Sequence, residues 1–314
     1  GIIMGRNPDV SYGTYRLLSF DELWKKSGFD ESEHMFSVRT RSADEEYGNG
    51  VHQWYCGMQD AGGVLQKGPW VGNRFHWYCL FDNEDYRITK GVKHRFQYDS
   101  QVKNGRGYYY PGTPEYKLMA TGKNMDDVKV QEPVAPFNDG LTYTNSISSN
   151  CLAFTTKYAD VTDPTIGRTD AYWPFLRYAD IVLIYAEAQC ELNDGISQDA
   201  IDALNDIRIR SNAKEASVTG DGAIETKVEL RSVIFEERAK ELAYEGDRRW
   251  DLLRWGIYLD VMNSLGGINE DGTRTPYDEG SINKRREFRH LLYPLPSLEV
   301  STNMAIDKNN PGWN

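Results

Sequence analysis

"EERAKELAYEGDRRWDLLRWG", residues 236–256, is the stretch that decides the fold. It interleaves Glu and Asp with Lys and Arg and carries two tryptophans. Glu237, Glu241 and Glu245 recur every four residues, a spacing that places three carboxylates on one face of a helix. These carboxylates either form a catalytic site or belong to an architectural helix whose charges neutralise one another.

The catalytic interpretation is glycoside hydrolysis, which needs two carboxyl groups about 5–10 Å apart. Side chains four residues apart on a helix are about 6 Å apart, so the spacing permits it. A neighbouring cation, however, lowers the pKa of a carboxyl group and so weakens it as a general acid. The expected pairs are Glu236 with Lys240, Glu245 with Arg248 or Arg249, and Asp251 with Arg254. We therefore favour an architectural helix.

Helical patterns dominate the chain from residue 173 onward. A first helix is predicted from Pro174 to Gly195; it is apolar on most of its surface, which indicates that it is covered on several sides. A second helix is capped near Ser197, and the two helices match a tetratricopeptide-type hairpin in length. One such hairpin cannot bury its own faces, since stable arrays need about three repeats. A third helix is predicted from about Glu225 to Gly256, with close helix packing as the reason for Gly246 inside it.

The first 172 residues are punctuated by Gly, Pro, Asn and Asp. They predict a short helix over 19–28, capped by Ser19 and ended by Gly28, and a strand over 34–40. Long loops follow, and ordered loops of this length are usually functional. Near the other end, "YPLP" is predicted to be extended. We expect a mainly α fold and a single region over 1–314, with a loop-rich, short-strand part over 1–172 and a helical part over 173–314 that ends in an extended tail.

Composition excludes several classes of protein. The chain has 314 residues and a net charge of -11, without the long basic stripe that nucleic-acid binding requires. No apolar run approaches the roughly 18 residues of a membrane-spanning helix. The first residues, "GIIMGRNP", lack the basic and apolar regions of a signal peptide.

Cysteine and histidine give no sign of a metal site. The four cysteines form no CxxC pair, so zinc is not expected. They leave open one or two disulfides or four buried thiols; they are Cys56, Cys79, Cys151 and Cys190. The five histidines lack metal-ligand spacing and are expected at the surface or in loops. No catalytic motif for a cofactor or a nucleophile is present either, so no cofactor is expected.

The loops over 47–112 are rich in aromatic residues and carry two near-echoes, "HQWYCGMQD" and "FHWYCLFDN". Aromatic rings stack on the apolar C–H face of a sugar, while amide and guanidinium groups bridge its hydroxyls. Because neighbours in an extended chain face opposite ways, one residue of each Trp-Tyr pair would be exposed. The alternative is that these aromatics form a core beneath the loops. The candidate ligand contacts are Trp54, Tyr55, Trp70, Asn73, Arg74, Trp77, Tyr78 and Tyr109.

Three motifs, in order, resemble the SusD/RagB family of outer-membrane glycan-binding lipoproteins. They are "LRYADIVLIYAEAQCELND", "ERAKELAYEGDRRWDLLRWG" and "LLYPLPSLEVSTNMAIDKNNPGWN", the last with Trp313 where Tyr is usual. The match is close over 172–314 and looser before it. Family members are usually longer, with an N-terminal region that supplies most of the tetratricopeptide helices, so we expect either a piece of such a chain or a naturally short form.

The resemblance implies a SusD-like fold in which the 236–256 helix is structural. It implies glycan binding without catalysis and delivery of the ligand to a SusC-like TonB-dependent transporter. It also implies a lipid anchor, absent from this chain, that holds the protein at the extracellular face of the outer membrane. Two alternatives remain: a glycoside hydrolase using loop carboxylates such as Asp60, Asp82 or Asp85, and a helical-repeat adaptor that binds only protein.

Overall fold

The computed structural model describes residues 15–25, 33–42, 49–60, 62–68, 70–71, 77, 80–82, 84–93, 95–97, 104–107, 142–145, 154–264 and 286–313. The chain divides into two compact units. Unit 1 comprises residues 1–119 and 124–245, and unit 2 comprises residues 120–123 and 246–314. The expectation that residues 1–314 form a single region stays a prediction.

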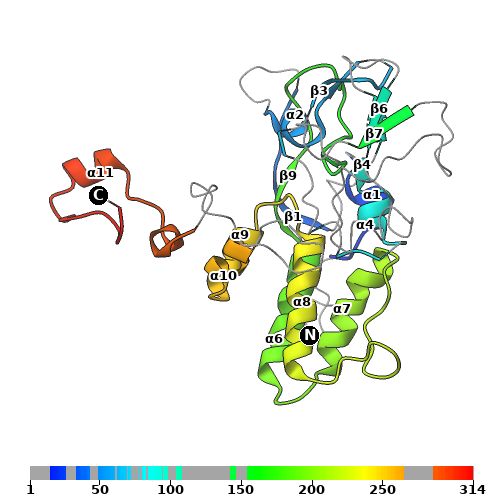
Figure 1. The fold of residues 1–314 in the computed structure, drawn as a ribbon, viewed down its shortest axis with the longest axis vertical. Coiled ribbons are helices and arrows are strands. Elements are labelled where there is room, and N and C mark those ends of the chain that lie inside the picture. Colours follow the sequence, from blue (N-terminus) through cyan, green and yellow to red (C-terminus); the bar gives the residue numbers. More distant parts are fainter. Residues whose placement is uncertain are drawn as a thin grey trace. The chain divides into compact units, whose positions relative to one another are not determined.

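Three long helices form the helical part of unit 1 and lie side by side (Figure 1): α6 (Tyr178–Leu192), α7 (Gln198–Arg210) and α8 (Lys227–Glu241). Their core is made of fully buried Leu, Ile and Ala side chains, including Leu204 and Ile234. Ser197 caps α7 as predicted, because its side chain accepts a hydrogen bond from the backbone of Ala200. The expected helical hairpin is therefore present as α6 and α7.

The first of these helices begins later than predicted. Residues 173–177 form strand β9 (Trp173–Arg177), which pairs antiparallel with β1 (His34–Val38). Trp173 and Phe175 are aromatic residues suited to strands, and Arg177 is still extended at the N-cap of α6. Pro174 is therefore a strand residue, and the prediction of a helix from Pro174 was wrong by four residues.

The predicted helix over 225–256 is also broken. Helix α8 ends at Glu241, and α9 (Arg248–Arg254) begins a new helix after a turn in which Tyr244 and Gly246 have φ of 68° and 104°. Lys157 Nζ donates to the carbonyl oxygens of Glu241 and Ala243 at 2.8 and 2.7 Å, so a side-chain cation satisfies oxygens at the end of the helix. Gly246 is explained by its left-handed backbone rather than by close helix packing.

The rest of unit 1 consists of short elements. Its helices are α1 (Phe20–Leu23), α2 (Val51–Cys56) and α4 (Tyr86–Thr89). Its remaining strands are β2 (Met58–Gln59), β3 (Leu65–Lys67), β4 (Val92–Lys93), β5 (Arg95–Gln97), β6 (Asn104–Gly107), β7 (Thr142–Asn145) and β8 (Phe154–Thr155). They pair as β2–β3, β4–β8 and β5–β6–β7, with β6 and β7 parallel. The predicted mainly α fold with a loop-rich, short-strand part is confirmed.

A second core of unit 1 is aromatic. Trp24 and Tyr158 are buried at its centre, and Tyr55, Trp173 and Tyr244 pack against it. The rings of Tyr158 and Trp173 are stacked with centroids 5.4 Å apart, whereas Tyr55 meets Tyr158 edge-on. Part of the high aromatic content is therefore structural.

Unit 2 contains α9, α10 (Tyr258–Ser264), the 3₁₀ helix η5 (Phe288–Leu291) and α11 (Ser297–Thr302). The "YPLP" segment before α11 is non-helical, as predicted, and its last residue, Pro296, has extended dihedral angles of φ -54° and ψ 136°. In the described part of the chain, no helix is both long enough and apolar enough to cross a bilayer.

Candidate functional site

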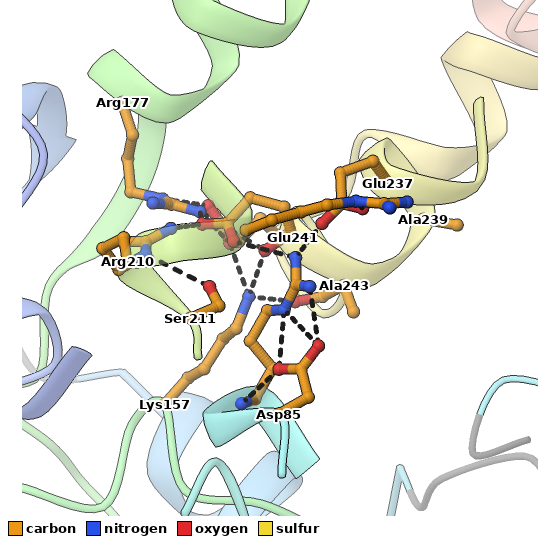
Figure 2. A network of polar contacts seen from close by, with 12 residues as sticks. Asp85, Lys157, Arg177, Arg210, Ser211, Glu237, Ala239, Glu241 and Ala243 are labelled. Carbon is orange, nitrogen blue, oxygen red and sulfur yellow. Dashed lines mark hydrogen bonds and ion pairs between the residues drawn. The ribbon is translucent and has the colours of Figure 1, made fainter. Parts of the chain in front are cut away.

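Glu237, Glu241 and Glu245, the three carboxylates predicted to share one helix face, lie in a buried network of ion pairs (Figure 2). Glu241 is its centre: its carboxylate accepts from Arg177 Nη2 at 3.0 Å, from Arg87 Nη1 at 3.5 Å and from Arg210. The Glu241 side chain is only 3% exposed. A carboxylate enclosed by three guanidinium groups has no free side to offer a substrate.

The two flanking carboxylates are held in the same way. Their ion pairs are Glu237 with Arg87 and Arg208, and Glu245 with Arg177 and Lys157. Arg177 also binds Glu33 at 2.7 Å, and Arg87 binds Asp85 at 2.7 Å, so the network joins the loop-rich part of unit 1 to its helices. The sequence correctly predicted that cations neutralise these carboxylates. The partners that it predicted for Glu245, however, were local ones. Its actual partners come from distant segments.

The electrostatics agree with an architectural role. Burial opposes ionisation of Glu241, but the guanidinium groups of Arg210 and Arg177 outweigh it and hold its pKa far below the ordinary value. The pKa of Glu237 and Glu245 is also lowered, despite their burial, by Arg87 and Arg177 respectively. Groups that stay ionised to low pH are poor general acids. The pairs predicted at helical spacing, Glu236 with Lys240 and Asp251 with Arg254, are present.

The loop carboxylates of the hydrolase alternative also have structural partners. Asp60 Oδ1 accepts from the backbone N–H groups of Gly62 and Val64 at 2.8 and 2.9 Å and so closes the β2–β3 hairpin. Asp85 is 1% exposed and caps α4 while pairing with Arg87. These contacts account for the carboxyl groups of Asp60 and Asp85 without a substrate.

The aromatic candidates divide into packed and exposed residues. Tyr55 lies in the aromatic core. Trp77 Nε1 donates to the carbonyl oxygen of Ala239 at 2.8 Å, and its ring contacts Phe81 with centroids 4.6 Å apart. Trp54 and Trp70, by contrast, are 46% and 78% exposed. The remaining candidates, Asn73, Arg74, Tyr78 and Tyr109, lie outside the described residues.

Trp54 and Trp70 come from segments that hydrogen bonds hold together. The carbonyl oxygen of Trp54, near the end of α2, accepts from the backbone N–H groups of Trp70 and Val71 at 2.9 and 3.1 Å. Figure 1 shows α2 beside β3, the strand that precedes Trp70. We call Trp54 and Trp70 the indole platform. Its two exposed indoles come from backbone segments that these hydrogen bonds join in the loop-rich part of unit 1.

The sequence did not single out Gln53, which precedes Trp54 on α2. Its side chain is half-buried, whereas Val51, His52 and Cys56 are buried. The signal was present in "HQWYC", where a residue that can bridge hydroxyls adjoins an indole. Helical spacing of the apolar residues around it would have placed it outside.

Histidine and cysteine have structural roles where they are described. His52 is 1% exposed and donates through Nδ1 to the Tyr158 carbonyl at 2.9 Å, and burial lowers its pKa. Its expected surface position was therefore wrong, because α2 turns it into the core. Cys56 and Cys190 are free and buried, as the thiol alternative predicts, and burial raises the pKa of Cys56 to about 12. Cys79 and Cys151 lie outside the described residues.

Among the residues that the structure describes, no three His, Cys, Asp or Glu side chains gather as metal ligands would.

Comparison with known proteins gives a consistent set of similarities. A model of the SusD family matches residues 59–313. SusD-like protein P2 of Formosa agariphila is 33% identical over 142 residues, which cover 44% of this chain and 25% of that protein. SusD-like protein P38 of the same organism is 36% identical over 142 residues, which cover 43% of this chain and 25% of that protein. The chain spans about a quarter of the length of these curated relatives.

Solved structures are similar in fold. A SusD superfamily protein from Parabacteroides distasonis superposes with a TM-score of 0.58 at 18% identity, over 95% of this chain and 54% of that chain. Surface glycan-binding protein A from Bacteroides thetaiotaomicron, in complex with laminarihexaose, gives a TM-score of 0.55 at 19% identity, over 96% of this chain and 56% of that chain. At these identities, the likeness shows the fold alone.

Proposed function

This chain belongs to the SusD family, and we propose that it binds oligosaccharide or polysaccharide without cleaving it. The observation that carries the proposal is the indole platform, where Trp54 and Trp70 are exposed on neighbouring segments. Large exposed indole rings are unfavourable in water unless a ligand covers them. The apolar face of a sugar can cover such a ring. The pairing of Glu237, Glu241 and Glu245 with cations supports binding without catalysis.

The wider role is proposed from the family. The protein would act at the extracellular face of the outer membrane, held by a lipid anchor. It would deliver its glycan to a SusC-like TonB-dependent transporter. Similarity to SusD-like proteins P2 and P38 and to glycan-binding protein A supports this role.

The test is native affinity electrophoresis against a panel of soluble polysaccharides, with a reducing-end assay on each one that slows the protein. We expect retardation by at least one polysaccharide and no new reducing ends. Trp54→Ala and Trp70→Ala should each weaken binding about tenfold, the effect of truncating a central aromatic contact. Trp250→Ala is the matched control, because Trp250 is 57% exposed but lies in unit 2.

Three results would count against the proposal. New reducing ends from a retained polysaccharide would establish catalysis. Unchanged retardation in both platform variants would place the ligand elsewhere. A full panel without retardation would argue against glycan binding itself.

A further inference from the structure

Two consecutive residues of α2, Gln53 and Trp54, are half-buried and exposed, respectively. The neighbouring Tyr55 packs on the ring of Tyr158 with centroids 5.4 Å apart, which fixes the rotation of this short helix. The side chains of Gln53 and Trp54 therefore start from Cα atoms about 3.8 Å apart on a rigid support. An indole and an amide thus come from neighbouring positions of one short helix.

Gly50 determines how the indole lies. A Cβ on Gly50 would meet Trp54 Cε2 at 2.7 Å, Cζ2 at 2.9 Å and Nε1 at 3.0 Å. Cε2 is the inner atom of the three, and it would be the farthest in an edge-on approach. Since it is the nearest, one face of the indole covers Gly50. The opposite face is therefore the one left to solvent, and it is available for stacking.

The Gln53 amide lies against the backbone of Gly167. A Cβ on Gly167 would lie 2.5 Å from Gln53 Oε1, so no side chain separates the amide from this glycine. Within the described part of the chain, no side chain or backbone group hydrogen-bonds to the Gln53 amide. It therefore retains two N–H donors and the accepting capacity of its oxygen. An amide without hydrogen-bond partners, next in sequence to an indole with a free face, offers the two kinds of contact that a sugar ring needs.

We propose that Gln53 is a ligand-binding residue of the indole platform and that the ligand unit is a hexopyranose with equatorial hydroxyls, as in gluco-configured sugars. This inference rests on the proposed glycan-binding function and narrows it. A pyranose lying flat on Trp54 directs its equatorial hydroxyls outward in the plane of the ring, where the amide of the adjacent Gln53 would meet them. An axial hydroxyl on the stacked face would hold the ring off the indole and lose the contact.

The test is isothermal titration calorimetry with hexasaccharides. The gluco-configured ligands are cellohexaose, laminarihexaose and maltohexaose, and mannohexaose is the axial counterpart of cellohexaose. We expect at least one gluco-configured hexasaccharide to bind and mannohexaose to bind at least tenfold more weakly than that ligand. Gln53→Ala should weaken binding about 5- to 10-fold, as expected for losing one or two hydrogen bonds at roughly 1 kcal/mol each. Gln66→Ala is the matched control, because the Gln66 amide already donates to Asp60 Oδ2 at 3.2 Å.

A second variant tests the position of the indole without removing it. Gly50→Ala leaves Trp54 in the sequence, but the new methyl group displaces its ring. Gly50 has φ of -90°, so alanine fits the backbone and stability should change little. We expect binding to fall as in Trp54→Ala, with a shift in tryptophan fluorescence and an unchanged midpoint of urea unfolding.

The outcomes separate this inference from the proposed function. If Trp54→Ala loses binding and Gln53→Ala does not, the role of Gln53 is overturned and the platform stands. If mannohexaose binds as tightly as the gluco-configured ligands, or if polysaccharides bind and no hexasaccharide of the gluco series does, the ligand class is wrong. If no glycan of either panel binds, the proposed function itself fails.

Discussion

At the scale of the residue, Glu241 has the largest predicted effect on stability. Glu241→Gln removes the charge that Arg87, Arg177 and Arg210 share and leaves these buried cations undercompensated. Breaking a buried ion pair by changing one partner costs about 3–5 kcal/mol of unfolding free energy. Urea denaturation measures it. Glu236→Gln is the control: its side chain is 45% exposed and its pair with Lys240 should contribute less than about 1 kcal/mol. Equal losses in the two variants would contradict the network.

The same carboxylates predict how stability depends on pH. In the folded chain the pKa of Glu237, Glu241 and Glu245 is held below its ordinary value by neighbouring guanidinium and ammonium groups, despite burial. Their stabilisation is present above the pKa of an unfolded carboxyl, about 4.3, and is lost as pH falls through the folded pKa. The unfolding free energy should therefore fall below about pH 5, since protons then bind the unfolded chain preferentially. In urea titrations at several pH values, Glu241→Gln should fall less steeply; curves parallel to those of the unchanged protein would refute this origin.

At the scale of the element, the turn between α8 and α9 depends on Gly246. Its φ of 104° lies where a side chain is strained, so Gly246→Ala should destabilise the chain by about 1–3 kcal/mol. Gly195→Ala is the control, since a Cβ there would have no atom within 4 Å. Chemical denaturation of both variants compares the two costs. A Gly246→Ala protein as stable as Gly195→Ala would mean that the turn tolerates a β-carbon.

The helices also show what local sequence can and cannot predict. Ser197 caps α7 through its neighbour Ala200, and this contact is local, so the pattern predicted it. The break after Glu241 depends on Lys157, which lies 84 residues away along the chain. Likewise, the strand over 173–177 depends on pairing with β1. In both cases the predicted helix was wrong because contacts with residues distant in the sequence outweighed a local helical pattern.

For the site, the aromatic content of the loops led to a prediction of ligand contacts but did not indicate which indoles are exposed. Trp54 and Trp77 have nearly the same sequence neighbours, "QWYC" and "HWYC". Trp77 meets Ala239 on α8 and becomes half-buried, whereas Trp54 meets Gly50 and stays exposed. The difference lies in tertiary contacts that these two similar sequence segments do not determine.

At the scale of the whole molecule, the buried network makes unit 1 one cooperative body. It links Glu33, before β1, and Arg87, on α4, to three carboxylates at the end of α8 and just beyond it. If one segment detached from this network, it would leave unpaired charges in a buried site. Its local opening should therefore cost nearly as much free energy as global unfolding. We therefore expect α4, through Arg87, and β9, through Arg177, to open with α6–α8 rather than before them.

Hydrogen exchange followed by mass spectrometry tests this expectation in the full chain. Peptides covering α4, β9 and α8 should report similar opening free energies and the same decrease when urea is added. In Glu241→Gln the coupling weakens, so peptides from α4 and β9 should lose protection before those from α6 and α7, whose apolar core does not use the network. Glu236→Gln should keep all of them together. Separate opening free energies already in the unchanged protein would show that apolar packing of each part, rather than the ion network, determines its stability.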